Sequence, residues 1–190
     1  HDVRVLVREP ERHGWLRDRG AITVVPGELE NQESLRQLVA GADAVVHLVG
    51  IIAEIGRQTF DRVHVQGTRL LVAAAREAGV RKFVQMSALG ARIDQNATPY
   101  HQSKAAAEQI VASGGVPYVT LRPSLIAAPG NEVLGMMVGM LRLSPLVPVI
   151  GNGLYQLQPI AADDVAEAIA LSVEDAIRIA TDAYVYGYPL

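Results

Sequence analysis

Short apolar runs rich in β-branched residues alternate with longer stretches of helical periodicity along most of this chain. Such alternation is typical of βα units that build a parallel sheet. It predicts strands at residues 3–8, 21–25, 44–49, 82–86 and 118–121. It predicts helices at about residues 11–18, 34–39, 60–77, 99–112 and 165–172. The predicted fold class is therefore α/β, with a doubly wound parallel sheet.

Residues that stop or start helices stand at the predicted helix ends. Gly20, Gly41 and Gly79 follow helical stretches and fit C-terminal stops. Thr98 followed by Pro99 fits an N-cap with a first-turn proline. These signals leave only a few linking residues for each crossover, as βα units require.

Composition narrows the classes of function. The chain has 190 residues, is 49% hydrophobic and 19% charged, and contains no Cys, which fits one globular domain and excludes a disulfide scaffold. Its 17 basic and 20 acidic side chains give a net charge of −3, which argues against nucleic-acid binding through a basic face. The five histidines are not spaced as a ligand set, so no metal site is predicted.

The lengths of the apolar stretches indicate whether the chain can span a membrane. The longest of them are broken by charged residues or prolines well before the roughly 20 residues that a membrane span needs. We therefore predict no membrane span, leave peripheral membrane association open, and take the cytoplasm as the expected compartment.

Tyr100 and Lys104 form the strongest chemical signal in the sequence. A spacing of four puts them on one face of the predicted helix, where an ammonium can stabilise a phenolate and lower the tyrosine pKa from about 10. Tyr100 is thus predicted to donate a proton to a carbonyl, and Lys104 to contact a cofactor ribose. Taken alone, this common pair also fits a surface tyrosine beside a solvated lysine.

The position of this pair in the chain supports a functional role. It follows the predicted strand at residues 82–86 and its exit residue Ser87. Open α/β sheets bind ligands at the carboxyl edge of their strands. Ser87 is therefore a third candidate catalytic residue.

On these motifs and others, the chain resembles the extended and atypical branches of the short-chain dehydrogenase/reductase family. The matching segments are residues 43–50, 63–68, 79–84, 100–104, 121–124 and 158–166. Within that family, the chain is most similar to NAD-dependent epimerase/dehydratases, to NmrA-like proteins and to the nucleotide-binding accessory subunit of respiratory complex I.

The resemblance implies a Rossmann-type fold and a nicotinamide dinucleotide ligand. It implies a single NAD(P)-binding domain over residues 1–190, to which residues 123–190 contribute a small C-terminal substrate lobe. It also implies a set of cofactor-binding residues: Arg8, Glu28, Leu29, Leu48, Val49, Gly50, His64, Met86, Tyr100, Lys104, Pro123 and Ser124.

The sequence departs from the family pattern in three places. It contains no Gly-x-x-Gly-x-x-Gly turn, and its first strand looks like the family's second, so the domain is expected to lack the first strand and that turn. Catalytic members often carry consecutive serines where this chain has Ser87 and Ala88. His64 stands where the family usually has Asn, and an imidazole replaces only some hydrogen bonds of an amide.

Arg8 bears on the choice between NADP and NAD. In the family, a basic residue at the end of this strand favours NADP, because a guanidinium can hold the 2′-phosphate in a bidentate manner. The acidic neighbour Glu9 weakens this argument, and a solvated arginine is the alternative. NADP is therefore the first choice and NAD the second. Glu28 and Leu29 match an acidic–apolar pair that lies near the adenine in the family.

Two functions fit these residues. The first is an NADPH-dependent oxidoreductase acting on a carbonyl, an enone or a quinone, with Tyr100, Lys104 and Ser87 as catalytic residues. The alternative is a non-catalytic NADPH-binding structural or sensor module. We favour the enzyme slightly, because Tyr100 and Lys104 are both present. A small-molecule substrate or quinone is the expected partner, and a homo-oligomer is left open.

Overall fold

The computed structural model describes residues 2–128, 135, 138–140, 142 and 158–174. Its strands are β1 (Val3–Val7), β2 (Ile22–Pro26), β3 (Ala44–His47), β4 (Lys82–Met86), β5 (Tyr118–Leu121), β6 (Ile126–Ala127) and β7 (Ile160–Ala161). Its main helices are α1 (Gln32–Val39), α2 (Gly67–Glu77), α3 (Pro99–Ala112) and α5 (Ala162–Glu174). A 3₁₀ segment, η1 (Pro10–Arg19), and a π-helical segment, η2 (Asp61–Gln66), complete the described elements.

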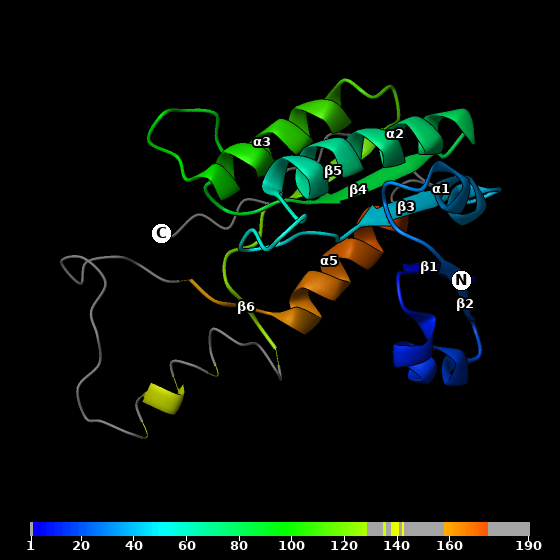
Figure 1. The fold of residues 1–190 in the computed structure, drawn as a ribbon, viewed down its shortest axis with the longest axis horizontal. Coiled ribbons are helices and arrows are strands. Elements are labelled where there is room, and N and C mark those ends of the chain that lie inside the picture. The colour runs from blue at the N-terminus through cyan, green and yellow to red at the C-terminus, as the bar shows by residue number, and fades with distance from the viewer. Residues whose placement is uncertain (1, 129–134, 136–137, 141, 143–157, 175–190) are drawn as a thin grey trace.

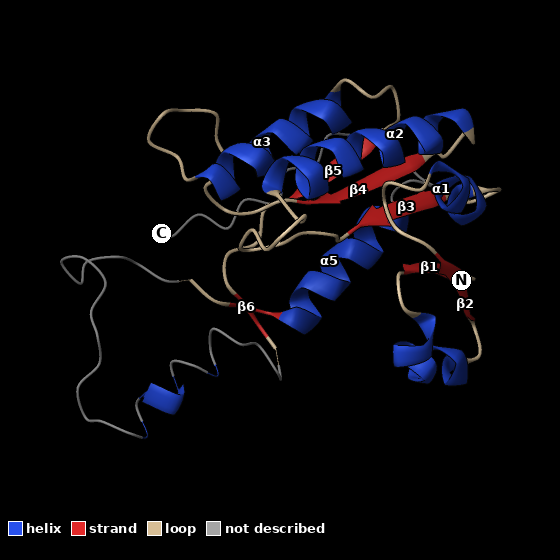
Figure 2. Ribbon diagram, viewed as in Figure 1, coloured by secondary structure: helices blue, strands red, loops and turns tan. Residues whose placement is uncertain are grey.

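Every described strand pair is parallel. β1 pairs with β2 in one sheet. The strands β3, β4 and β5 form a second sheet in that order, and β6 pairs with β7 in a third (Figure 2). The carboxyl ends of strands within a parallel sheet lie at one edge. The loops that follow β3, β4 and β5 therefore meet at the same side of the central sheet.

Helices cover both faces of the central sheet. α2 and α3 lie over one face and α5 over the other (Figure 1). All five residues of β4 are buried, as expected of a central parallel strand. Phe83 belongs to the core under α1, α2 and α3, whereas Val84 belongs to the core under α5. The alternation of side chains along β4 thus supplies both layers.

Capping contacts fix the ends of several elements as the sequence predicts. The Thr98 hydroxyl accepts the backbone N–H of His101 at the start of α3. Gly20, Gly41 and Gly79 have φ values of 62°, 65° and 71°, in the left-handed region that favours glycine. The Thr98 cap and the three glycines confirm the helix ends that the sequence predicts at these positions.

Other predicted boundaries are shifted. The strand predicted at 44–49 ends at His47, because Leu48 and Val49 leave the sheet and are 55% and 44% exposed. The helix predicted at 60–77 is divided into η2 and α2, and the helix predicted at 11–18 is a 3₁₀ segment.

The carboxyl-terminal part is described only in pieces. α5 extends beyond the predicted 165–172 at both ends, and two aspartates lie in its first turn, where they favour the helix dipole. Val165 of this helix packs against β4 and β5. The substrate lobe predicted over residues 123–190 remains a prediction, because much of that range lies outside the described residues. None of the described helices has the length and apolarity to cross a membrane.

Candidate active and cofactor site

Most predicted site residues lie at or just beyond strand ends. Arg8 lies just beyond β1, and Glu28 and Leu29 lie beyond β2. The segment 48–50 follows β3. Met86 ends β4 and Ser87 follows it, and Pro123 and Ser124 lie just beyond β5. The backbone N–H of Leu89 donates to the carbonyl of Pro123, so the exits of β4 and β5 are tied together. These predicted residues thus lie at the carboxyl ends of strands in two sheets, β1–β2 and β3–β4–β5.

Lys104 is buried at the end of β4. Its side chain comes from α3, the residue is only 4% exposed, and its ammonium donates to the carbonyl of Met86 at 3.1 Å. A β-carbon added to Gly50 would lie 2.9 Å from Nζ, so the loop after β3 passes directly over the ammonium. Burial lowers the pKa of Lys104, and Glu108 opposes that shift.

His64 connects the loop after β3 to the start of α3. Its Nε2 accepts the backbone N–H of Ile51 at 2.9 Å, so the neutral ring carries its hydrogen on Nδ1. Nδ1 then donates to the Ser103 hydroxyl at 2.8 Å, and that hydroxyl donates to the carbonyl of Tyr100 at 2.8 Å. Burial first, and then the charge of Lys104, lowers the His64 pKa to about 4. The ring therefore stays neutral and linked at both nitrogens.

Both ring nitrogens of His64 are engaged within the protein, by Ile51 and by Ser103. The cofactor contact that the resemblance implies for His64 stays a prediction, and a contact through either nitrogen would replace one of these two partners. Neither of these was a predicted site residue, although Ser103 lies inside the Tyr100–Lys104 motif and could have been suspected on that ground.

Tyr100 lies in a cluster of rings. The centroid of its ring is 5.9 Å from that of Phe60, 5.7 Å from that of His64 and 5.3 Å from that of His101, each in an edge-on arrangement. Phe60 also stacks on His64 with centroids 5.5 Å apart. Burial raises the pKa of Tyr100 above its usual 10. The expectation that Lys104 lowers this pKa is wrong, because the phenol is buried and the ammonium is bonded to Met86.

Three buried polar atoms near the end of the central sheet have no hydrogen-bond partner among the described residues. They are Nδ1 of His47, Oε1 of Gln85 and Oγ of Ser87. His47 is held through its other nitrogen, 2.9 Å from the Thr68 hydroxyl, and burial lowers its pKa to about 3. The free Ser87 hydroxyl is at the exit of β4, where it can donate to an incoming oxygen.

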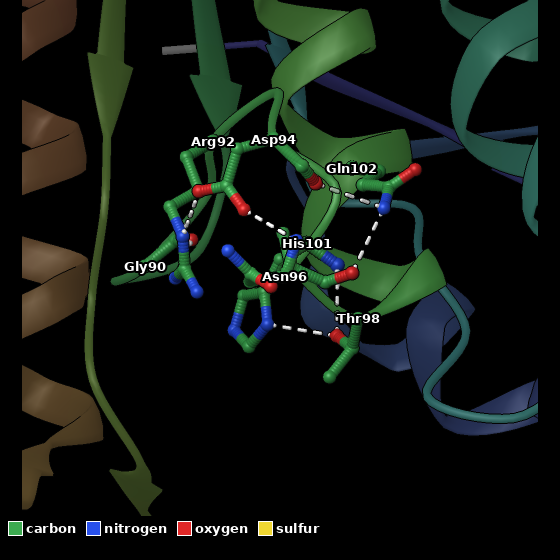
Figure 3. Close-up of polar contacts among 8 residues, drawn as sticks. Gly90, Arg92, Asp94, Asn96, Thr98, His101 and Gln102 are labelled. Atoms are coloured by element: carbon green, nitrogen blue, oxygen red, sulfur yellow. Dashed lines mark hydrogen bonds and ion pairs between the residues drawn. The ribbon is translucent and has the colours of Figure 1, made fainter.

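The loop between β4 and α3 is held by its own polar contacts (Figure 3). Arg92 pairs with Asp94 at 2.6 Å, and the same carboxylate accepts the backbone N–H of Asn96 at 2.6 Å. The amide of Gln102, on α3, donates to the carbonyls of Asp94 and Ala97 at 3.1 and 2.8 Å. This loop is therefore anchored to the helix turn that carries Tyr100.

Arg8, Glu28 and Leu29 lie on the smaller sheet. Arg8 and Glu28 are exposed, whereas Leu29 is half-buried. A β-carbon on Gly67 would lie 2.9 Å from a methyl group of Leu29, so this leucine packs on the first residue of α2. The residues expected near the adenosine of the cofactor thus lie at the strand ends. The charged groups of Arg8 and Glu28 are accessible to a ligand there.

These residues fit the ribose and nicotinamide half of a dinucleotide. Lys104 supplies a buried cation beside a glycine loop, and Ser87 supplies a buried hydroxyl without a partner. The Gly-x-x-Gly-x-x-Gly pattern that would receive the pyrophosphate is missing from the 190 residues. The fit therefore concerns the half of the cofactor that takes part in hydride transfer.

Comparison with known protein families decides the assignment. The profile of the NAD(P)H-binding family matches residues 1–176. The chain belongs to this family. Its membership confirms the predicted resemblance to atypical short-chain dehydrogenase/reductases and the predicted nicotinamide dinucleotide ligand, and it leaves NADP and NAD as alternatives.

Relatives of this NAD(P)H-binding chain include enzymes and an accessory subunit. It is 36% identical over 150 residues to a ceramide reductase of Caulobacter vibrioides, covering 78% of this chain and 46% of the relative. It is 26% identical over 159 residues to the mitochondrial NADH dehydrogenase [ubiquinone] 1 alpha subcomplex subunit 9 of Arabidopsis thaliana. This match covers 83% of this chain and 39% of the relative. The chain thus spans less than half the length of these two relatives.

Solved structures confirm the fold class. The dTDP-glucose 4,6-dehydratase DesIV of Streptomyces venezuelae, with NAD bound, superimposes with a TM-score of 0.71 at 20% identity, covering 97% of this chain and 66% of that one. MoeE5 in complex with UDP-glucuronic acid and NAD superimposes with a TM-score of 0.73 at 20% identity. The superposition covers 97% of this chain and 75% of MoeE5. The NAD(P)H-binding chain therefore has the Rossmann-type fold that its sequence predicts.

Proposed function

We propose that this protein is an NADPH-dependent reductase of carbonyl compounds. The observation that carries the proposal is the placement of Tyr100 and Lys104 on one helix at the carboxyl end of β4, where the Lys104 ammonium reaches the Met86 carbonyl beside Ser87. A proton donor, a fixed cation and a free hydroxyl at one strand end are the groups that carbonyl reduction requires.

Each group has a distinct part in this reaction. The bound dinucleotide supplies the hydride. Tyr100, whose raised pKa keeps the phenol protonated at neutral pH, donates the proton to the carbonyl oxygen. Ser87 donates a hydrogen bond to the same oxygen through its unpartnered hydroxyl, and Lys104 holds the ribose hydroxyls. Phe60 and His64 keep the Tyr100 ring in place through their edge contacts.

The relatives support reduction of a carbonyl over reduction of an enone or a quinone. The ceramide reductase of Caulobacter vibrioides shares 36% identity with this chain over 150 residues. A carbonyl group is therefore the first substrate class to test, ahead of enones and quinones. NADPH is the proposed cofactor on account of Arg8, which is exposed at the end of β1.

The test is the substitution Tyr100→Phe, which removes the hydroxyl and keeps the ring. We expect NADPH oxidation with a panel of ketones, enones and quinones to fall by roughly 10² to 10⁴, while NADPH affinity stays near that of the parent. Tyr118→Phe is the matched control, because Tyr118 is the first residue of β5, at the other end of the strand. Full activity in Tyr100→Phe would rule out Tyr100 as the acid.

A second candidate function is a non-catalytic NADPH-binding module. It is favoured by the similarity to the complex I subunit and by Ala88, which stands where catalytic relatives often have a second serine. A parent protein that binds NADPH but oxidises it with no member of the panel would favour this module over the reductase.

A further inference from the structure

His101 is a half-buried histidine beside Tyr100 that the proposed reaction does not use. Its Nδ1 lies 2.8 Å from the Thr98 hydroxyl, and the same hydroxyl accepts the His101 backbone N–H. When the Thr98 hydroxyl donates to Nδ1, the neutral imidazole carries its hydrogen on Nε2. The helix cap thus holds the ring in one orientation and leaves Nε2 as a donor.

The second ring nitrogen is directed toward the exit loop of β4. A β-carbon on Gly90 would lie 3.4 Å from Nε2, and Gly90 itself is exposed with φ of 88°. Nε2 has no hydrogen-bond partner in the part of the chain that the structure describes. Figure 3 shows the imidazole bonded to Thr98 on one side, with its other nitrogen turned away from that contact.

Polar contacts hold the loop beside Nε2. The Arg92 guanidinium is bonded to Asp94 and to the Gly90 carbonyl, and the loop is held to α3 by Gln102. The edge contact with Tyr100, at 5.3 Å between centroids, places the imidazole next to the proposed acid. A substrate bound at Tyr100 would therefore lie beside the His101 ring.

We propose that His101 is a specificity-determining residue that donates a hydrogen bond from Nε2 to a second oxygen of the substrate, close to the reacting carbonyl. The inference rests on the proposed reductase and narrows its substrate class to oxygenated carbonyl compounds, such as keto-amides and hydroxy-ketones. A simple ketone lacks the acceptor that this donor needs.

The test uses a matched pair of probes, acetoacetanilide and the phenylpentanone of the same chain length that lacks the amide. Binding of each is measured by calorimetry to the full protein loaded with NADP⁺, which cannot reduce them, and turnover is measured separately with NADPH. We expect the parent to bind acetoacetanilide about tenfold more tightly than the phenylpentanone. His101→Phe should remove that preference, and His101→Gln, which keeps a donor, should retain part of it.

Controls separate this role from a general loss of the site. NADPH affinity should be the same in both His101 variants and in the parent. His13→Phe, at an exposed histidine in η1, should keep the full preference.

The outcomes distinguish the two proposals. A His101-dependent preference in binding without turnover of either probe would contradict the reductase and support the His101 contact. Equal binding of the two probes by the parent, no binding of either, or an unchanged preference in His101→Phe would overturn the role of His101.

Discussion

Gly50 and Lys104 occupy one small space: a β-carbon on the glycine would lie 2.9 Å from the lysine ammonium and 3.3 Å from Nε2 of His64. A side chain at position 50 would require the end of the Lys104 side chain to shift. The position of the cation at the end of β4 therefore depends on a residue from another strand exit.

Gly50→Ala should displace Lys104 from Met86 and weaken NADPH binding by about tenfold, the effect of losing one good hydrogen bond. Fluorescence titration with NADPH measures this. Gly14→Ala is the matched control, because an added β-carbon there meets nothing within 4 Å. Unchanged affinity in Gly50→Ala would show that the ammonium does not contribute to binding from this position.

Ser103→Ala should destabilise the fold more than its small size suggests. The change leaves the Nδ1–H of His64 buried without an acceptor, which costs about 1 to 3 kcal/mol. Urea denaturation measures the free energy of unfolding. Ser113→Ala, at an exposed serine that ends the same helix, should change it by less than about 0.5 kcal/mol. Similar losses in both variants would contradict the His64–Ser103 link.

Stability should fall as the pH drops from 6.5 toward 4. The folded-state pKa of His64, about 4, lies below the ordinary value of 6.5, so the unfolded chain takes up the proton first and gains stability relative to the folded one. The loss from His64 is at most about 3 kcal/mol across this range. His47 adds a similar term that extends to about pH 3.

His64→Asn tests the contribution of His64 to that slope, because an amide keeps hydrogen bonding and does not titrate. The free energy of unfolding, measured by urea denaturation at several pH values, should depend less on pH in the variant. The same slope in the parent and in His64→Asn would assign the effect to other groups.

Arg8→Ala should reduce the preference for NADPH over NADH. A charge-assisted contact to the 2′-phosphate is worth on the order of 1 to 3 kcal/mol. Titration of the parent and the variant with both cofactors measures the ratio of affinities. Arg12→Ala is the control, because that exposed arginine pairs with Glu9. Equal affinities for the two cofactors in the parent would exclude Arg8 as a phosphate ligand.

The sequence predicts strands β1 to β5, because apolar runs and the glycine and proline signals are local. It misses the two-residue strands β6 and β7, which are too short to form a pattern. It also predicts that Tyr100 and Lys104 lie on one helix, since helical spacing is a local property. The end of β3 is missed, because Leu48 and Val49 continue the apolar run although their side chains are exposed. Periodicity cannot distinguish an apolar residue in a sheet from one that leaves it at a ligand-binding edge.

The electrostatics of the site could not be predicted in the same way. The spacing of Tyr100 and Lys104 suggested a lowered tyrosine pKa, but the shift depends on where the ammonium points and on how deeply the phenol is buried. The role of His64 likewise depends on Ile51 and Ser103, which come from distant parts of the chain. Such tertiary contacts carry no signal in a single sequence.

The burial of β4 has a consequence for measuring the stability of the protein. All five residues of β4 are buried, and β3 and β5 pair with it on its two sides. Amide hydrogens of β4 should therefore exchange with solvent only when the whole domain unfolds. Their exchange rates would then report the free energy of unfolding without added denaturant.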